Sequence, residues 1–395
     1  MINNEVTKIV NGKIIAENGV LEDHAVYFSG STILAVTDKD MPYDKQIDAE
    51  GLYVSPGFID THVHGGGGSD FMDGGAEPIV AASEFHLKHG TTTILPTTLA
   101  CSHETLMAFL QDLRSVMEGG MSKANIPGAH LEGPYFSHAQ SGAQKPEYIR
   151  DPKPAEYGEV LEKYGDIILK WSFAPERKGS EEFCEALVKQ NIVPSVGHSD
   201  ATLADIQKVH DKGCKHYTHL YSGMSTITRH GGYRVLGAVE SAYYFDDVDV
   251  EVIADGKHLP PELLQLIIKQ KGSDNVCLIT DGMRGAGMPE GESFLGRKGE
   301  EMPCIIEEGI AKLPDRTAFA GSVATTDRLV RTVVKLAGID LCEAVKMMTK
   351  NPARIVGLKS KGILKENYDA DIILFDEDIQ VKTVIVDGKT VIQED

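Results

Sequence analysis

Hydrophobic residues in the middle of the chain gather into short runs, each followed by a polar or helix-forming stretch. The runs are apolar and rich in β-branched residues, as expected of strands buried on both faces of a parallel sheet. From His62 to Asp281 there are 219 residues in seven intervals, about 31 each, which is the length of a strand-plus-helix unit. Eight runs fit this spacing: residues 57–63, 92–96, 126–131, 167–173, 192–196, 214–218, 248–254 and 275–280.

Eight strand-plus-helix units predict an α/β protein with a (β/α)8 TIM-type barrel over residues 56–354. The alternative is a doubly wound open sheet, which would carry a GxGxxG phosphate-binding motif after its first strand. Here His64 and four glycines, residues 65–68, follow the first run instead. The pattern therefore favours the barrel.

The two ends of the chain have a different texture, with short alternating stretches separated by turn residues. Asn11-Gly12 and Asn18-Gly19 stand between apolar stretches, which predicts β-hairpins at both places. Residues 371–375, 381–386 and 390–392 show the same texture near the C-terminus. Residues 1–55 and 355–395 are therefore predicted to build one small β-sandwich domain from both termini.

Composition and net charge limit the kinds of molecule that this protein is expected to bind. Hydrophobic residues make up 42% and charged residues 25%, which is ordinary for a globular protein. The formal net charge of -20 argues against nucleic acid and against an anionic membrane surface, although a small anionic substrate remains compatible with it. The six cysteines form no CxxC motif, no apolar run reaches the roughly 20 residues of a membrane helix, and no signal peptide is recognisable. We expect a cytoplasmic protein with reduced thiols.

Candidate chemistry begins in the first barrel run, where His62 and His64 are two residues apart. Side chains at i and i+2 of a strand lie on the same face, so the two imidazoles could form half of a metal site. A His-x-His pair alone is weak evidence, because buried histidines satisfied by hydrogen bonds are common. The residues at the ends of the other strands decide whether His62 and His64 are read as metal ligands.

Functional residues of a barrel of this type lie at the carboxyl ends of its strands. Those positions hold further histidines and carboxylates: Glu132, His198, His219, Asp255, His258 and Asp281. Together with His62 and His64 they are suitable ligands for one or two divalent metal ions. By the same alternation, His216 is expected to face away from His219. His130 shares a face with Glu132 and could be its partner, but we expect a buried histidine satisfied by hydrogen bonds.

The stretches around these strand-end residues resemble the motifs of a known family. The sequence Pro-Gly-Phe-Ile-Asp-Thr-His-Val-His at residues 56–64 resembles the first-strand signature of the amidohydrolase superfamily. Residues 351–353, 362–364 and 369–372 resemble its return into the β domain. Nearly the whole chain is similar to N-acetylglucosamine-6-phosphate deacetylases, most clearly at residues 130–135, 197–201, 218–221, 254–258, 280–283 and 320–322.

The resemblance implies the roles of the residues at the strand ends. Glu132, His198 and His219 would bind the main metal, and His62 and His64 would hold a second ion beside Asp281. Zinc and iron suit these imidazole and carboxylate ligands. Asp281 would act as general base and then general acid, and His258 would polarise the acetyl oxygen. Asp255 is expected to orient its turn.

The implied reaction is hydrolysis of N-acetylglucosamine-6-phosphate to glucosamine-6-phosphate and acetate, by a homodimer. The substrate-binding positions would include His258, Ser222, Gly223 and Ala320. Where the family usually has Asn-Ala-Met, this chain has Ser222-Gly223-Met224, and Gln144 replaces a common histidine. The residues expected to bind the phosphate are Arg229, His230 and Arg234, because arginine matches phosphate with bidentate geometry.

These departures leave other functions open. One is another amidohydrolase, acting on a galacto or unphosphorylated N-acetylhexosamine or on an N-acyl amino acid. A second, of another class, is a non-catalytic barrel scaffold, which would be expected to lose metal ligands. The glycine-rich residues 282–299 could be a mobile lid over the site or an exposed loop.

Overall fold

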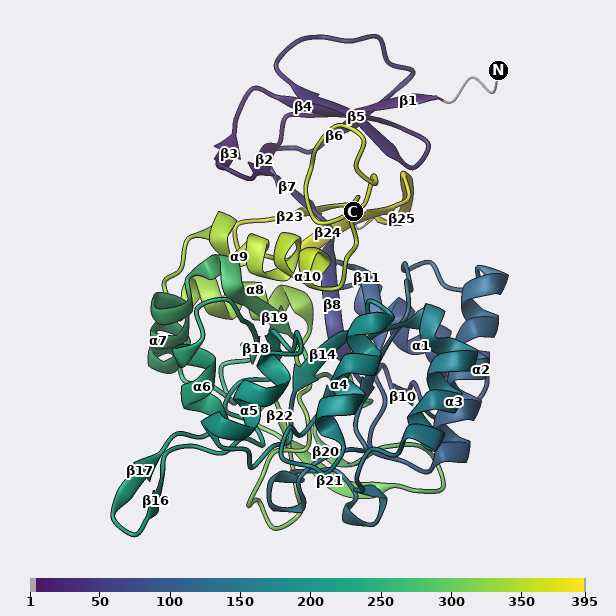
Figure 1. Cartoon of the computed structure of the whole chain (residues 1–395). Coiled ribbons are helices and arrows are strands. Elements are labelled where there is room, and N and C mark those ends of the chain that lie inside the picture. Colours follow the sequence, from purple (N-terminus) through teal and green to yellow (C-terminus); the bar gives the residue numbers. More distant parts are fainter. Residues whose placement is uncertain (1–4, 394–395) are drawn as a thin grey trace.

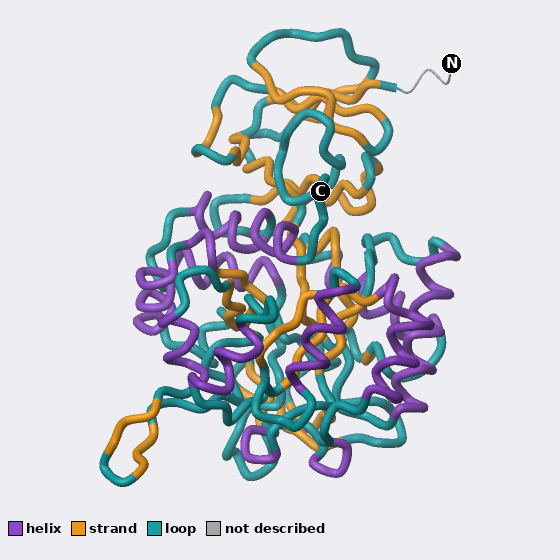
Figure 2. Tube along the Cα trace, in the orientation of Figure 1, coloured by secondary structure: helices purple, strands orange, loops and turns teal. Residues whose placement is uncertain are grey.

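The computed structural model describes residues 5–393, and its larger part is a closed barrel of parallel strands surrounded by helices (Figures 1 and 2). All eight predicted runs form strands within the described residues, which confirms the predicted fold class. The barrel strands, in chain order, are β8 (Phe58–Val63), β11 (Thr91–Pro96), β12 (Ala129–Glu132), β13 (Ile168–Phe173), β14 (Val193–Val196), β15 (His216–Tyr217), β18 (Asp249–Ile253) and β19 (Val276–Ile279).

Parallel pairing runs from β12 through β13, β14, β15 and β18 to β19, and β8 pairs with β11. Two bridges join these sheets into one cylinder: Thr97 pairs with His130, and Val63 pairs with Gly282. The closing seam is reinforced by the Asp281 amide, which donates to the His62 carbonyl at 2.9 Å. Closure brings the first and last strands, distant in sequence, to one place on the rim.

Helices follow the barrel strands and cover the outside of the cylinder (Figure 2). In α2 the buried face carries Leu106, Phe109, Leu110 and Leu113, with the 3.6-residue spacing of an amphipathic helix. The Ser102 hydroxyl caps its first turn by accepting from the Thr105 amide. The helices are α1 (Ala76–Leu87), α2 (His103–Gly119), α3 (Pro154–Tyr164), α4 (Ser180–Lys189), α5 (Leu203–His210), α6 (Ala238–Tyr244), α7 (Pro261–Lys271), α8 (Thr326–Lys335), α9 (Leu341–Met348) and α10 (Lys350–Ile355).

None of the helices in residues 5–393 combines the length and apolar character that crossing a bilayer requires.

Both ends of the chain meet in a β-rich part at the top of Figure 1. One sheet has the order β5-β4-β1-β6, and the other has the order β25-β24-β23-β7-β2-β3. Residues from both sheets share one buried cluster, which includes Ile9, Val26, Val54 and Leu374. The strands are β1 (Val6–Val10), β2 (Lys13–Ala16), β3 (Gly19–Leu21), β4 (Ala25–Ser29), β5 (Thr32–Thr37), β6 (Lys45–Asp48), β7 (Tyr53–Pro56), β23 (Ile372–Phe375), β24 (Val381–Val386) and β25 (Lys389–Gln393).

The two-sheet arrangement agrees with a β sandwich made from both termini, while the domain boundaries stay a prediction. Residues 1–4 and 394–395 of that predicted domain lie outside the described residues. One hairpin prediction is wrong. Across Asn11-Gly12 the chain passes from one sheet to the other, because β1 pairs with β4 and β6 whereas β2 pairs with β3 and β7. The hairpin at Asn18-Gly19 is confirmed by the pairing of Ala16 with Gly19.

Insertions after the strands build the rim of the barrel at the end away from the β-rich part (Figure 1). Part of the glycine-rich segment forms β20 (Gly291–Leu295), which pairs with β21 (Met302–Glu307), and β21 also pairs with β22 (Ile310–Lys312). A second small pair, β9 (Gly65–Gly66) and β10 (Ser69–Asp70), follows the first barrel strand. A hairpin of β16 (Thr228–His230) and β17 (Tyr233–Val235) projects from the body, at the lower left of Figure 1.

A buried ion pair in the C-terminal segment is joined to the barrel by a hydrogen bond from Asn125, and its loss is expected to destabilise the fold. Asp371 lies 2.5 Å from the Lys361 ammonium and accepts from the Asn125 side-chain amide at 3.0 Å. Asp371→Ala removes the more buried of the two carboxylates beside Lys361 and leaves the Asn125 and Asp387 donors without their acceptor, so it should lower the free energy of unfolding by roughly 3 kcal/mol. Urea unfolding measures the change. As a control, Asp369→Ala removes the more exposed partner of the same lysine and should cost less than about 1 kcal/mol; equal costs would contradict the prediction.

Candidate metal centre

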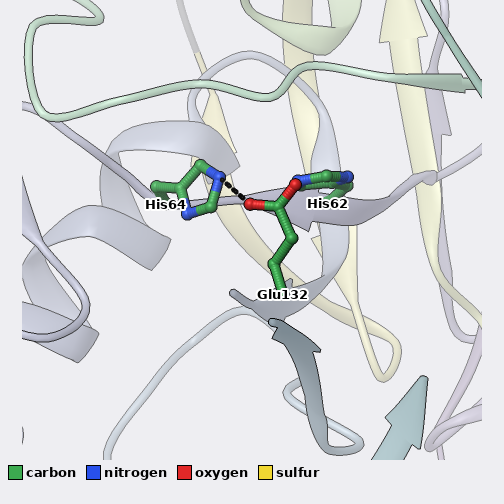
Figure 3. A group of neighbouring side chains, drawn as sticks. All are labelled: His62, His64 and Glu132. Carbon is green, nitrogen blue, oxygen red and sulfur yellow. Dashed lines mark ion pairs between the residues drawn. The ribbon is translucent and has the colours of Figure 1, made fainter. Parts of the chain in front are cut away.

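Six of the predicted residues meet at the carboxyl-terminal rim of the barrel, and we call them the rim cluster: His62, His64, Glu132, His198, His219 and Asp281. His62 and His64 come from the end of β8 and Glu132 from the end of β12. All six residues are buried, with exposed fractions of at most 9%. Figure 3 shows the Glu132 carboxylate lying between the rings of His62 and His64.

Glu132 is the centre of the rim cluster. Its Oε1 atom lies 2.9 Å from His219 Nε2, 3.2 Å from His198 Nε2 and 3.4 Å from His62 Nε2. Its other oxygen, Oε2, lies 3.3 Å from His64 Nε2. One carboxylate therefore faces four imidazoles from three different strand ends, as the sequence predicted.

Asp281 closes the cluster on the side of β8. Its Oδ1 atom lies 3.1 Å from His64 Nε2 and 3.5 Å from His62 Nε2. The backbone of Asp281 bridges its neighbours, because its amide donates to His62 and its carbonyl accepts from Ser322. A second carboxylate is thus held against the histidine pair by main-chain bonds.

The backbone at three of these positions is unusual. His198, His219 and Asp281 have φ values of 45°, 30° and 48°, in the left-handed region that non-glycine residues rarely adopt. Such conformations cost energy and concentrate at functional sites. Here they end the strand alternation, so that each side chain turns in over the mouth of the barrel.

The donor set fits a divalent metal ion. His62, His64 and Glu132 form one group, and Glu132, His198 and His219 form another, with the ligand atoms of each group within 4.8 Å of one another. The buried His62 Nε2 has no hydrogen-bond partner. Imidazole nitrogens and a carboxylate shared between the groups suit one or two ions of zinc or iron type.

The electrostatics of the cluster also favour a cation. Burial alone raises the pKa of Glu132, but the facing histidines outweigh it and hold the pKa well below its usual range. Burial lowers the pKa of His62, yet the nearby carboxylates raise it to about 9, and they raise the pKa of His64 to about 10. Both histidines therefore face ionised carboxylates that attract positive charge.

Below the rim cluster lies a buried pair that the sequence interpretation missed. Glu251 of β18 contacts the Lys170 ammonium of β13, and its Oε2 atom lies 3.2 Å from His62 Nδ1. All three side chains are fully buried. The signal was present in the sequence, since Lys170 and Glu251 are charges inside runs predicted to form buried strands.

The reason given for setting His216 aside is wrong. Its ring lies inside the barrel with Nδ1 2.8 Å from the Ser195 hydroxyl and Nε2 3.8 Å from Glu251. The positive φ at His219 breaks the alternation, so both rings turn inwards at different depths. His216 nevertheless lies outside the rim cluster. His130 is a buried core histidine, as expected, and its Nε2 bonds to Ser172 at 2.7 Å, whereas its Nδ1 has no hydrogen-bond partner.

A cavity of about 190 Å³ opens onto the rim cluster. It is lined by His64, Glu132, His198, His219 and Asp281, together with His258 and the neighbouring Phe319. Asp255 accepts from the amides of Lys257 and His258, and its Oδ2 lies 2.8 Å from His258 Nδ1. Asp255 therefore orients the turn and the ring of His258, in agreement with its predicted part.

Ser222, Gly223 and Gln144 also line the cavity. Gln144 accepts from the Ala100 amide at 2.7 Å and donates to Glu132 Oε2 at 2.8 Å, so its orientation is set by two bonds. At Gly223, with φ of 55°, a Cβ atom would lie 2.8 Å from His198 Nδ1, which explains the glycine. Ala320 is fully buried and lies behind the cavity wall formed by its neighbours Phe319 and Gly321.

The residues predicted to bind phosphate lie elsewhere. Arg229, His230 and Arg234 are exposed on the projecting hairpin of β16 and β17, where Arg229 pairs with Arg234 across the strands. None of the three lines the cavity of this chain. Their role in phosphate binding stays a prediction.

Comparisons with known proteins agree with this site. Residues 53–391 match the model of the Amidohydrolase family. The chain is 33% identical to the N-acetylglucosamine-6-phosphate deacetylase of Lysinibacillus sphaericus over 88% of each chain. It is 30% identical to the N-acetylgalactosamine-6-phosphate deacetylase of Escherichia coli O157:H7 over 95% of this chain and 97% of the relative.

Solved structures show the same likeness. A mutant N-acetyl-D-glucosamine-6-phosphate deacetylase from Mycobacterium smegmatis, in complex with N-acetyl-D-glucosamine-6-phosphate, is similar with a TM-score of 0.88 and 29% identity. The similarity covers 99% of this chain and all of that one. The enzyme of the same name from Pasteurella multocida has a TM-score of 0.90 at 28% identity, over 98% of this chain and all of that one.

Proposed function

Because this chain belongs to the amidohydrolase family and, within it, to the N-acetylglucosamine-6-phosphate deacetylases, we propose that it removes the acetyl group from N-acetylglucosamine-6-phosphate. The products are glucosamine-6-phosphate and acetate. The observation that carries the proposal is Glu132, whose two oxygens face four histidines at the floor of a cavity. A non-catalytic scaffold would have no need of this arrangement.

Glu132, His198 and His219 would hold the main metal ion, and His62 and His64 with Glu132 would hold a second. We propose zinc or iron, which accept imidazole and carboxylate ligands. When bound, such an ion lowers the pKa of water and polarises a carbonyl, the two requirements of amide hydrolysis. The residues of the rim cluster would supply its coordination, and the cavity would hold the acetamido group beside them.

Asp281 is the proposed proton carrier. Its carboxylate lines the cavity beside His64, where it can accept a proton from the attacking water and pass it to the leaving amine. His258 is proposed to donate a hydrogen bond to the acetyl oxygen. The Asp255 carboxylate accepts from His258 Nδ1, so Nε2 is the nitrogen available to the substrate, and it donates this bond when the ring carries a proton on both nitrogens.

A second candidate substrate is the galacto isomer, because the Escherichia coli relative is named for it and covers nearly the whole chain. The two sugars differ only in the configuration of one hydroxyl, so the chemistry at the amide is the same for both. The proposed phosphate ligands Arg229, His230 and Arg234 would act on either isomer.

Acetate release from a panel of four sugars tests the proposal: N-acetylglucosamine and N-acetylgalactosamine, each with and without a 6-phosphate. We expect the 6-phosphate of N-acetylglucosamine to have the highest kcat/KM, by at least about tenfold over the unphosphorylated sugar. A higher kcat/KM for the galacto phosphate would support the second candidate. An N-acyl amino acid serves as the comparison substrate, and preferential hydrolysis of it would refute both.

A further inference from the structure

We propose that Glu251 is a positioning residue for the metal centre: it holds His62 in the tautomer and orientation that present the Nε2 lone pair to a divalent cation. The inference rests on the metal-dependent function proposed above and assigns a part to two residues, Glu251 and Lys170, that do not line the cavity. It concerns the side of the rim cluster formed by His62 and His64.

The two nitrogens of His62 have different surroundings. Nδ1 lies 3.2 Å from Glu251 Oε2, whereas Nε2 lies among the rim carboxylates and has no hydrogen-bond partner. An ionised carboxylate only accepts hydrogen bonds, so Glu251 keeps a proton on Nδ1. Nε2 is then the ring nitrogen that carries the lone pair and can bind a cation. A carboxylate behind a metal-binding histidine fixes its tautomer and raises its basicity.

Lys170 keeps Glu251 in this state. The ammonium contacts Glu251 Oε1, which leaves Oε2 for His62, and the Thr61 hydroxyl lies 3.5 Å from Oε1. Lys170 and Glu251 are 0% exposed. A buried ion pair costs so much desolvation that apolar residues of similar size often replace it without loss of stability. Stability alone therefore does not account for this pair.

The other histidines of the rim cluster show that His62 is a special case among them. His198 Nδ1 donates to the Gln140 carbonyl at 2.8 Å, so the main chain orients that ring. The Nδ1 atoms of His64 and His219 have no hydrogen-bond partner. Within the rim cluster, His62 is thus the ring whose Nδ1 is held by another side chain, that of Glu251. Substitution of Glu251 can therefore test the arrangement.

Two double variants distinguish two roles of Glu251: positioning the ring of His62, and neutralising the charge of Lys170. Lys170→Met with Glu251→Leu removes the charges and the hydrogen-bond acceptor. Lys170→Met with Glu251→Gln removes the same charges but keeps an acceptor for His62 Nδ1. Both are compared with the wild type in the full chain by zinc content after dialysis and by zinc affinity in competition with a chromogenic chelator, and thermal melting checks the folding.

We expect the leucine double variant to bind the weaker zinc ion about 10–100-fold less tightly, and the glutamine double variant to stay within about threefold of the wild type. In a His62→Asn background the leucine change should have no further effect, because the residue it acts through is gone. Wild-type zinc affinity in the leucine variant would overturn the proposal. If that variant does not fold, Lys170→Met with Glu251→Met takes its place with the same expected result.

These outcomes distinguish this proposal from the proposed function. A wild-type chain that binds neither zinc nor iron would refute the metal-dependent function and this inference with it. Zinc binding in the wild type with no difference between the two double variants would refute the part of Glu251 alone. In that case the wild-type chain is still expected to release acetate from N-acetylglucosamine-6-phosphate, so the proposed function would stand.

Discussion

Replacing Asp281 by asparagine is expected to lower kcat for acetate release by about 10²–10⁴-fold, the usual contribution of a general acid–base group. Asparagine keeps the size of the side chain but cannot take up a proton. Glu132, His198 and His219 are unchanged in this variant, so the main metal ion should remain bound. Steady-state kinetics combined with metal analysis of the same preparation measures both effects.

Measuring kcat and metal content on the same preparation separates loss of proton transfer from loss of bound metal. Asp281 also lies 3.1 Å from His64 Nε2, so loss of an ion at the His62 and His64 side could lower activity by another route. Assays repeated with added zinc control for this. A variant that keeps its full metal content and more than about a tenth of the wild-type kcat would contradict the role of Asp281 in proton transfer.

Glu132→Gln is expected to have the larger effect on metal content. Both candidate groups share this carboxylate, and an amide is a much poorer ligand that also removes the negative charge facing four histidines. Bound metal should fall sharply at both positions. Since the ion supplies several kcal/mol of transition-state stabilisation, kcat/KM should fall by about a thousandfold or more.

Glu176→Gln is the matched control, because it makes the same chemical change at another carboxylate close to a strand end. Glu176 accepts from the Ser199 hydroxyl and the Asp200 amide and does not line the cavity. Metal content and kcat/KM are expected to stay close to the wild type in this variant. Full metal content in Glu132→Gln would contradict the assignment of Glu132 as the ligand shared by the two metal positions.

Hydrophobic pattern was sufficient to predict the barrel and much of the site. Strands that are buried on both faces are largely apolar, which makes runs such as residues 275–280 visible in the sequence. The carboxyl ends of parallel strands meet at one rim, so Glu132, His198 and Asp281 could be placed together without coordinates. The rim cluster follows this expectation residue by residue.

The predictions that were wrong depended on local conformation or on pairing. Alternation along the strand placed His216 and His219 on opposite faces, but the left-handed backbone of His219 turns its ring inwards as well. Asn11-Gly12 has the composition of a hairpin turn, yet β1 and β2 find their partners in different sheets. Neither a positive φ nor a choice of sheet can be determined from composition alone, because the packing of other segments decides it.

By itself, then, the sequence determined which residues carry chemistry and at which end of which strand they stand, because burial on both faces and strand direction leave few alternatives. Only the tertiary structure decided what surrounds them. Glu251 and Lys170 come from strands 81 residues apart and meet beneath His62 because the barrel closes. The three arginine and histidine residues predicted for phosphate lie on a projecting hairpin, whose two strands pair with each other and not with the barrel sheet. Distances of this kind arise from packing between distant segments, which no local pattern encodes.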